Sequence, residues 1–448
     1  MSEAPTRFDP PPHRRTVRGW LYTTMQSLRG FPLDAFAREL AAAEALPQAE
    51  FDRQHAERLT AALEHARAHV PLYRTRGWVG AQAPHVAGLD TWPVLEREIV
   101  RARLDELRSR TRGRAVTRHT SGSTGVNLKV KLSPHAEAWG WAHRYRGLLW
   151  HGLPIGVPSL RLSHHLRPFR DFLLDQHCVP NLDSEEAVGK AVRYLTETRP
   201  PLVTGPPSTL FYLARCLAER GVEAPLAPYA RVGGEQLFGF QRRAIERHLC
   251  ARALNSYGCT EIGAVAGECE AGSLHIFADH VHVEIFDGSS PASPGEIGDI
   301  VLTSLHNPAM PLVRYRVGDR GRLAMEPCRC GLPLPVLTDL QARAADTFLS
   351  EDGRRRHASE LVSQLDTFFA DPVSTGVRQA QFEQIGALAW RVWVEVHDDG
   401  LTGGALDARL AGLVREIAGE GCSVEVHAAR TLPRVRGKFY YYRLATTG

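Results

Sequence analysis

The N-terminal part of the chain carries a helical pattern of hydrophobic positions. Between residues 33 and 69, apolar side chains recur three or four positions apart on two successive stretches, as they do on one face of a helix. The residues on these faces are Phe36, Leu40 and Ala43, followed by Leu59, Leu63 and Ala66. Pro47 separates the two stretches, because proline interrupts helical hydrogen bonding. The pattern therefore predicts two amphipathic helices in this region.

A different pattern runs from about residue 115 to residue 305, where short apolar strand candidates alternate with helical stretches. The strand candidates are SLRLS at 159, PLVTG at 201, ARVGG at 230 and RALNSYG at 252, and the helical stretches are 184–198, 207–219 and 236–248. Alternation of this kind predicts an α/β fold. Three of the strand candidates end in glycine-bearing turns, at the carboxyl ends of strands where such folds bind ligands.

The pattern changes again after about residue 340. Strands are expected around 376–397 and at SVEVHAA, residues 423–429, with one helix near 404–418 between them. A basic and aromatic tail, RVRGKFYYYR, follows. These elements predict a small α+β domain at the C-terminal end of an otherwise α/β chain.

Length and composition support two globular domains and narrow the expected partners. With 448 residues, the chain is longer than one ordinary compact core accommodates. Its composition, 43% hydrophobic and 23% charged residues, is that of a globular protein. Lys and Arg exceed Asp and Glu by only four (54 − 50) and are scattered, so nucleic acid is not the expected partner. No export signal opens the chain and no eighteen apolar residues run together, so we expect no membrane span and a cytoplasmic location. Eight cysteines in so long a chain do not indicate a disulfide framework.

Residues 118–133 combine small hydroxyl residues and glycines with two lysines. The loop residues are Thr120, Ser121, Gly122, Ser123, Thr124 and Gly125, and Lys129 and Lys131 follow them. The glycines let the backbone approach a ligand closely, and the hydroxyl groups and lysines supply hydrogen bonds and positive charge. Together these features favour phosphate binding. The loop lacks the Walker pattern, and taken alone it is also consistent with a flexible surface turn.

Three further segments accompany this loop in a fixed order. They are NSYGCTE at 255–261, YRVGD at 315–319 and PRVRGK at 433–438. The four segments together resemble the signatures of the adenylate-forming superfamily, which includes acyl-CoA synthetases, luciferases and peptide-synthetase adenylation domains. Only two residues separate Pro-Arg from Gly-Lys here, where the commonest form of the superfamily has three. This spacing resembles the phenylacetate-CoA ligase branch, as do the segments HVPLYR at 69–74, GECEAGSLHI at 267–276 and CRCG at 328–331.

The resemblance implies an ATP-dependent enzyme with two domains and a hinge. An N-terminal α/β domain over 1–341 would bind ATP and a carboxylic acid, a hinge would occupy 342–346, and a mobile α+β domain would cover 347–448. The acid would form an acyl-AMP with release of pyrophosphate, and rotation of the C-terminal domain would then let a thiol such as coenzyme A accept the acyl group. The residues implied for ATP binding are Thr120, Ser121, Gly122, Ser123, Thr124, Gly125, Gly234, Glu235, Ser256, Tyr257, Gly258, Thr260, Asp319 and Arg343.

Charged residues in these motifs take individual roles under the same resemblance. Asp319 would bind the ribose hydroxyls, and Glu261 would hold Mg2+ beside the triphosphate, where a second negative group requires a cation. Lys438 would stabilise the charge that develops on the α-phosphate, and Glu261 and Lys438 are the predicted catalytic residues. Asp346 would be the hinge pivot. The hinge reads ARAAD where the family commonly has GRxxD, and a salt bridge at a domain junction is the alternative for Arg343 and Asp346.

Four residues outside these motifs form a candidate metal site. Cys269, His275, Cys328 and Cys330 offer three thiolates and one imidazole, a set that suits structural zinc. Their spacing is not that of a familiar zinc finger. The alternative is a group of buried cysteines with one packed histidine.

The acyl pocket is assigned to Trp141, Tyr145, Gly205 and Gly233, following the family's pocket segments. Aromatic walls favour a flat, aromatic acid, although the same aromatic residues also suit a helix core. Transfer to a carrier-protein thiol or to an amine is the alternative to CoA, and a nucleotide-binding homologue without turnover is the second alternative. Some members of the family dimerise, so a homodimer is a further expectation.

Overall fold

The computed structural model divides the chain into two compact units. It describes residues 16–75, 86–111, 113–119, 128–163, 166–180, 182–341, 347–370, 374, 376–396, 404–434 and 439–444. Unit 1 comprises Met1–Val157, Leu173–Asp175 and Leu254–Leu340, and unit 2 comprises Pro158–Phe172, Gln176–Ala253 and Gln341–Gly448. The expected hinge at 342–346 lies outside the described residues, so the division into domains 1–341 and 347–448 stays a prediction.

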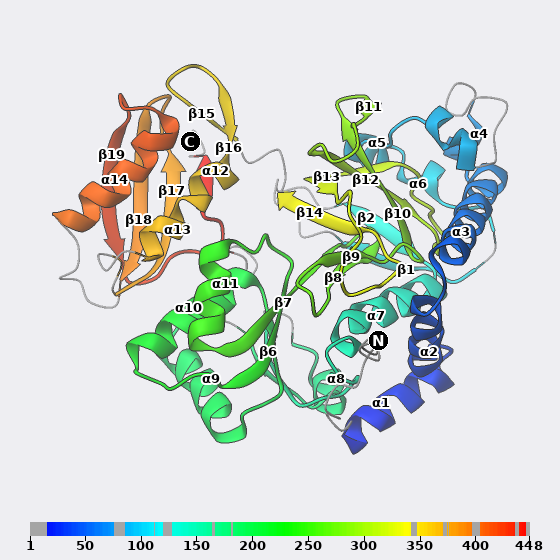
Figure 1. The fold of residues 1–448 in the computed structure, drawn as a ribbon, viewed down its shortest axis with the longest axis horizontal. Coiled ribbons are helices and arrows are strands. Elements are labelled where there is room, and N and C mark those ends of the chain that lie inside the picture. Colours follow the sequence, from blue (N-terminus) through cyan, green and yellow to red (C-terminus); the bar gives the residue numbers. More distant parts are fainter. Residues whose placement is uncertain are drawn as a thin grey trace, which may run out of the picture. The chain divides into compact units, whose positions relative to one another are not determined.

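Unit 1 begins with a series of helices (Figure 1). They are α1 (Val17–Leu28), α2 (Leu33–Glu44), α3 (Gln48–His69), α4 (Pro71–Arg74), the 3-10 helix η1 (Val86–Thr91), α5 (Arg97–Ala102), α6 (Leu104–Leu107) and α7 (Pro134–Leu149). The two helices expected between 33 and 69 are confirmed as α2 and α3, and Pro47 is the residue that precedes α3. Leu59, Leu63 and Ala66 of α3 are fully buried, as their shared helical face predicts.

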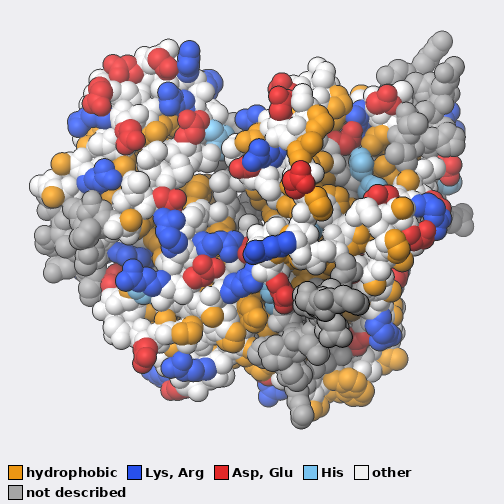
Figure 2. Space-filling view, in the orientation of Figure 1, with side chains coloured by type: hydrophobic (Ala, Val, Ile, Leu, Met, Phe, Trp, Pro, Cys, Tyr) orange, Lys and Arg blue, Asp and Glu red, His pale blue; other side chains and the backbone are white. Residues whose placement is uncertain are grey.

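Helix α1 differs from the others because much of its surface is apolar and exposed. Val17, Trp20, Leu21 and Leu28 are exposed hydrophobic residues of this helix. Hydrophobic side chains are visible in Figure 2 at the edge where Figure 1 places α1. Among the described residues, no helix combines the length and apolar character needed to cross a membrane.

The rest of unit 1 is a mostly antiparallel sheet. Its strands are β7 (Cys250–Cys259), β8 (Gly263–Glu268), β9 (Leu274–Ile276), β10 (Val281–Asp287), β11 (Ser290–Pro291), β12 (Gly298–Ser304), β13 (Tyr315–Leu323) and β14 (Val336–Gln341), in the order β7-β8-β9-β14-β13-β12-β10-β11. A separate antiparallel pair joins β1 (Val116–His119) to β2 (Lys129–Leu132). The predicted alternation with helices therefore ends at β7, because turns and loops rather than helices connect the strands that follow.

Unit 2 contains the parallel α/β part of the chain. Its strands run in the order β6 (Ala227–Gly233), β5 (Leu202–Gly205), β3 (Ser159–Leu162), β4 (Gln176–Val179), all parallel. Its helices α8 (Pro168–Leu173), α9 (Glu185–Thr198), α10 (Pro207–Glu219) and α11 (Gly239–His248) include all three helical stretches expected from the sequence. The α/β fold class is thus confirmed.

The C-terminal part of unit 2 has the expected α+β elements. A four-stranded sheet has the order β19 (Ser423–Ala429), β18 (Ala389–Val396), β17 (Val377–Gln384), β20 (Tyr442–Leu444), and α14 (Ala405–Ala418) lies between β18 and β19 in the chain. The remaining elements are the pair β15 (Thr347–Leu349) and β16 (Arg355–His357) and the short helices α12 (Ala358–Ser363) and α13 (Leu365–Ala370).

Within unit 2, this C-terminal part packs against α10 and α11. Phe211 of α10 and Phe240 of α11 belong to the same hydrophobic cluster as Trp390 of β18. Arg378 of β17 is 4% exposed and pairs with Glu219 of α10, with 2.9 Å between Nη2 and the carboxylate. Apolar packing and a buried ion pair therefore hold the C-terminal part in this position, and its expected rotation stays a prediction.

Candidate active site and cysteine-histidine cluster

The YGCTE motif lies on a tight hairpin formed by β7 and β8. Cys259 pairs with Gly263 and Gly258 with Ala264, and the register shifts between Tyr257 and Gly258. A Cβ atom on Gly258 would lie 2.4 Å from the Gly263 carbonyl oxygen, and Gly263 itself has a φ of +104°. Only glycine allows so close an approach of two backbones. The hairpin thus explains the glycine in the motif without reference to a ligand.

Tyr257 and Asp319, both predicted nucleotide residues, are in direct contact. The Tyr257 hydroxyl donates a hydrogen bond of 2.8 Å to Oδ2 of Asp319. Burial, with the Asp319 carboxylate beside it, raises the pKa of the Tyr257 phenol well above its usual range. The phenol therefore stays protonated at neutral pH and holds the Asp319 carboxylate in one orientation.

Glu261 lies in the turn of the same hairpin and is 3% exposed. Its Oε1 accepts a hydrogen bond of 2.9 Å from the hydroxyl of Tyr315 and forms an ion pair of 3.4 Å with Arg97. Burial raises the pKa of Tyr315, so this phenol also remains a donor. Both donors engage Oε1, and no described residue donates to Oε2. A carboxylate held by one oxygen in this way suits a Mg2+ ligand that uses the other.

The predicted residues of unit 2 lie at the carboxyl ends of its parallel strands. Gly205 ends β5 and Gly233 ends β6, and Gly234 follows with a φ of +89°. Glu235 accepts a hydrogen bond of 3.2 Å from the backbone N–H of Ser208, at the start of α10. Strand ends with glycine turns next to a helix N-terminus are the usual ligand positions in α/β sheets. Their role in binding adenine or acid stays a prediction.

Several predicted site residues lie outside the described residues. They are Thr120, Ser121, Gly122, Ser123, Thr124, Gly125, Arg343, Asp346 and Lys438. The segments that flank Lys438 are described and are anchored within unit 2. Arg434 donates to Oε1 of Gln379 at 2.9 Å, and the Tyr441 hydroxyl accepts from Gln241 of α11 at 2.8 Å.

Trp141 and Tyr145, predicted to line the acyl pocket, lie on α7. Their ring centroids are 6.3 Å apart, and both are partly buried. They pack against a small hydrophobic cluster made of Tyr22, Leu33, Ile155 and Leu174. The contacts seen are those of a helix core, and an acyl pocket at this position stays a prediction.

A buried ion network in unit 1 was not anticipated from the sequence. Arg146 of α7 is 1% exposed and lies 2.8 Å from both carboxylate oxygens of Asp279 and 2.5 Å from Glu44 of α2. His143 bonds the same Asp279 carboxylate at 3.0 Å. Asp279 and Glu44 lie more than a hundred positions from Arg146 in the sequence, so no local pattern signals the network.

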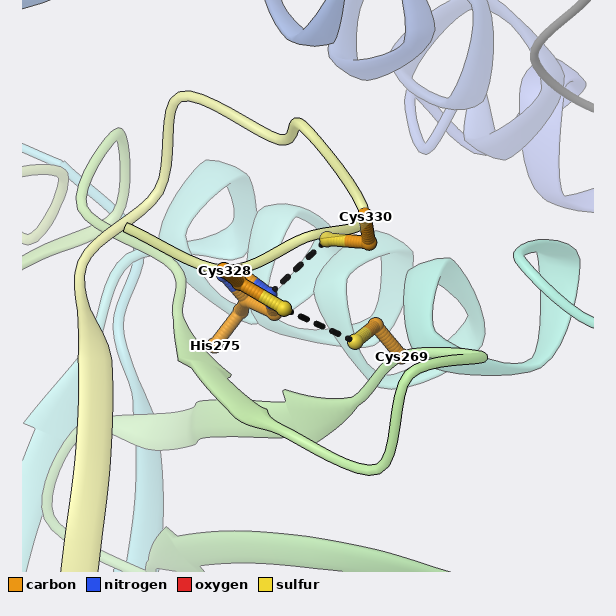
Figure 3. Close-up of side chains that lie close together, drawn as sticks. All are labelled: Cys269, His275, Cys328 and Cys330. Atoms are coloured by element: carbon orange, nitrogen blue, oxygen red, sulfur yellow. Dashed lines mark hydrogen bonds between the residues drawn. The ribbon is translucent and has the colours of Figure 1, made fainter. Parts of the chain in front are cut away.

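The four predicted zinc ligands come together in unit 1 (Figure 3). Cys269 follows β8, His275 lies in β9, and Cys328 and Cys330 lie between β13 and β14. Sγ of Cys269 is 3.8 Å from Sγ of Cys328, and Sγ of Cys330 is 3.2 Å from Nε2 of His275. All four ligand atoms lie within 4.8 Å of one another.

The surroundings of this cysteine-histidine cluster favour a metal. Nδ1 of His275 lies 2.8 Å from the Leu334 carbonyl oxygen, which turns Nε2 toward the sulfur atoms. The hydrogen bond from Cys330 is the main cause of a lowered pKa at the Cys269 thiol, and the same interaction raises the pKa of the Cys330 thiol. Thiolates are the form of cysteine that binds zinc, and three thiolates with one imidazole make a common tetrahedral set. The residues therefore fit a structural Zn2+.

No family model matches the chain. In sequence it is similar to the phenylacetate-coenzyme A ligase of Thermus thermophilus, with 34% identity over 150 residues, which is 32% of this chain and 34% of that protein. It is also similar to the phenylacetate-coenzyme A ligase of Pseudomonas putida, with 34% identity over 146 residues, or 30% and 32%. The matched segments thus span about a third of the length of these relatives.

Two solved structures share the fold. The crystal structure of 2-hydroxyisobutyryl-CoA ligase in the postadenylation state with 2-HIB-AMP matches with a TM-score of 0.71 and 18% identity, over 90% of this chain and 91% of that chain. An anthranilate CoA ligase in complex with anthranoyl-AMP matches with a TM-score of 0.51 and 12% identity, over 72% and 65%. Sequence and fold together confirm the expected resemblance: about a third of the chain is similar in sequence to phenylacetate-coenzyme A ligases, and the chain shares the fold of CoA ligases of known structure.

Proposed function

We propose that the chain is an ATP-dependent ligase that activates a carboxylic acid and joins it to coenzyme A. The observation that carries this proposal is the arrangement in unit 1, where Tyr257 holds Asp319 while Glu261 sits buried on the same hairpin as Tyr257. These are the carboxylates that the family resemblance assigns to the ribose and to Mg2+. The similarity to phenylacetate-coenzyme A ligases supports the same assignment.

The proposed first step forms an acyl-AMP. An oxygen of the substrate carboxylate attacks the α-phosphorus of ATP, the bond to the β-phosphate oxygen breaks, and pyrophosphate leaves. The protein contributes position and charge rather than a nucleophile. Asp319 would accept hydrogen bonds from the ribose hydroxyls, and Lys438 would stabilise the α-phosphate. Mg2+ bound at Glu261 would neutralise charge on the phosphates.

In the proposed second step, the thiol of CoA attacks the acyl carbonyl carbon and AMP leaves. We propose an aromatic acid as the substrate, because phenylacetate and anthranilate appear in the names of the relatives and of one structural neighbour. Free CoA is the acceptor in the names of all these ligases. A carrier protein or an amine is therefore a less well supported acceptor than CoA.

The test is acid-dependent release of pyrophosphate from ATP and Mg2+, with aryl, arylacetic, amino and fatty acids supplied with and without CoA. We expect release with an aromatic acid, and AMP turnover that depends on CoA. Asp319→Asn and Glu261→Gln should abolish release, whereas Asp352→Asn, at an exposed position of the C-terminal part, should not. No release with any acid, despite measurable ATP binding, would overturn the proposal in favour of a homologue without turnover.

We also propose that Cys269, His275, Cys328 and Cys330 bind one structural Zn2+. The four convergent ligand atoms and the oriented imidazole support this. Metal analysis of the purified protein should find about one zinc per chain. Cys328→Ser should lose the metal, whereas Cys216→Ser, at a buried cysteine of α10, should retain it. A chain that folds and contains no zinc when expressed with the metal would refute the proposal.

A further inference from the structure

The backbone of the turn that carries Glu261 is hydrogen-bonded to a histidine that no sequence motif indicated. Between Cys259, the last residue of β7, and Gly263, the first of β8, the chain has only three residues, and Glu261 is the middle one. The carbonyl oxygen of Ile262 lies 3.2 Å from Nε2 of His280. His280 comes from the segment between β9 and β10, and it is 3% exposed.

The protonation of His280 is set by its surroundings. Burial lowers the pKa of His280 to about 4, so the ring is neutral at physiological pH and carries one N–H. Nδ1 is buried and has no hydrogen-bond partner among the described residues. The ring proton therefore lies on Nε2, where it is donated to the Ile262 carbonyl. A neutral histidine thus gives its single donor to the backbone of the turn.

The ring of His280 is itself fixed in place. Its centroid lies 4.7 Å from that of His143 on α7, and His143 is bonded to Asp279, the residue before His280. Asp279 is held in turn by the two 2.8 Å hydrogen bonds from Arg146. A donor on so constrained a ring fixes the acceptor as well, because neither partner can shift without breaking buried contacts.

We propose that His280 is a positioning residue for Glu261, which fixes the turn so that Oε2 of Glu261 is presented to a divalent cation bound with ATP. Tyr315 and Arg97 hold the carboxylate end of Glu261 through Oε1, and His280 holds its backbone end through Ile262. The inference rests on the proposed function for the identity of the ligand. It goes beyond that function because it states that His280, which does not touch the cation, contributes to the affinity of the site for the cation.

The experiment compares three substitutions at position 280 with one control substitution at position 306. His280→Gln places an amide N–H near the position of Nε2 and should preserve the bond to Ile262. His280→Asn places its amide near Nδ1, too short to reach Ile262, and His280→Leu removes the donor altogether. His306→Leu is the matched control, because the half-buried His306 belongs to the same group of neighbouring rings as His280, with centroids 6.2 Å apart, but bonds the Asp279 carbonyl at 2.8 Å.

The readout is the binding of Mn2+, used in place of Mg2+, in the presence of a non-hydrolysable ATP analogue, measured by electron paramagnetic resonance of the free ion. His280→Leu and His280→Asn should weaken Mn2+ binding about tenfold, as expected for loss of one buried hydrogen bond. His280→Gln and His306→Leu should stay within about twofold of the unmodified chain. Circular dichroism establishes that each variant is folded before the measurement.

Two outcomes overturn the inference. Unchanged Mn2+ binding in both His280→Leu and His280→Asn would show that the turn needs no such support. Equal weakening of Mn2+ binding in His306→Leu would show that the histidine rings contribute only through packing and not through the hydrogen bond to Ile262. Failure of the proposed function is recognised separately, because an absence of acid-dependent pyrophosphate release in the unmodified chain leaves the Mn2+ measurement interpretable.

Discussion

We expect Arg146→Met to destabilise unit 1 strongly. Methionine has a similar length to arginine but removes the cation that lies 2.8 Å from Asp279 and 2.5 Å from Glu44. Asp279 is 1% exposed, so its carboxylate cannot recover hydration in the folded state. Removing one partner of a buried ion pair costs about 3–5 kcal/mol, because the remaining charge stays buried without compensation.

Urea unfolding at neutral pH, followed by tryptophan fluorescence, measures this loss. Trp150 is a suitable reporter, because the Arg146 guanidinium lies 5.9 Å from its ring centroid. With a slope of about 3 kcal/mol/M, the midpoint should fall by roughly 1–1.7 M. Arg53→Met, at an exposed helix position, is the control and should leave the midpoint unchanged. A shift below about 0.3 M for Arg146→Met would refute the reasoning, and Asp279→Asn in the same chain should restore part of the loss.

Three further predictions concern the hairpin and the buried histidines. Gly258→Ala should destabilise unit 1 by about 1–3 kcal/mol and abolish ATP binding, since the added Cβ would lie 2.4 Å from a backbone oxygen; unchanged binding in calorimetry would contradict this. Tyr257→Phe should raise the KM for ATP about tenfold by releasing Asp319, and an unchanged KM in the pyrophosphate assay would argue against that role. Burial lowers the pKa values of His280 and His306 from 6.5 to about 4, so the unfolded chain binds protons first as the pH falls. Stability should therefore be complete above about pH 6.5 and decline toward pH 4, and urea midpoints measured across this range test the sign.

Local patterns predicted the elements whose residues lie close together in the chain. The stretch 207–219 matches α10, and Pro47 marks the start of α3, because helical periodicity and proline act within a few residues. The strand expected at 252 is found as part of β7, but its pairing with β8 in a hairpin around Gly258 was not predicted, although the motif contains the glycine that the turn requires.

Contacts between distant parts of the chain could not be predicted in this way. Arg378 and Glu219 are 159 positions apart, and nothing near either residue indicates the partner. The same is true of His280 and the turn at Ile262, since a single buried histidine has no periodicity. The cysteine-histidine cluster is the exception. Cysteine and histidine are recognisable as metal ligands from the residue type alone, so the set could be proposed without knowing the fold.

The interleaved division of the chain has a consequence for its synthesis on the ribosome. The first segment of unit 1 ends at residue 157, but the strands that complete its sheet end at residue 340. At typical translation rates, roughly 10–40 s separate the emergence of these two points. During that interval the apolar faces of α2, α3 and α7 lack most of the sheet strands of their unit. The nascent chain should therefore depend on chaperones until late in translation, and truncated chains that end before residue 340 should aggregate rather than yield a folded half.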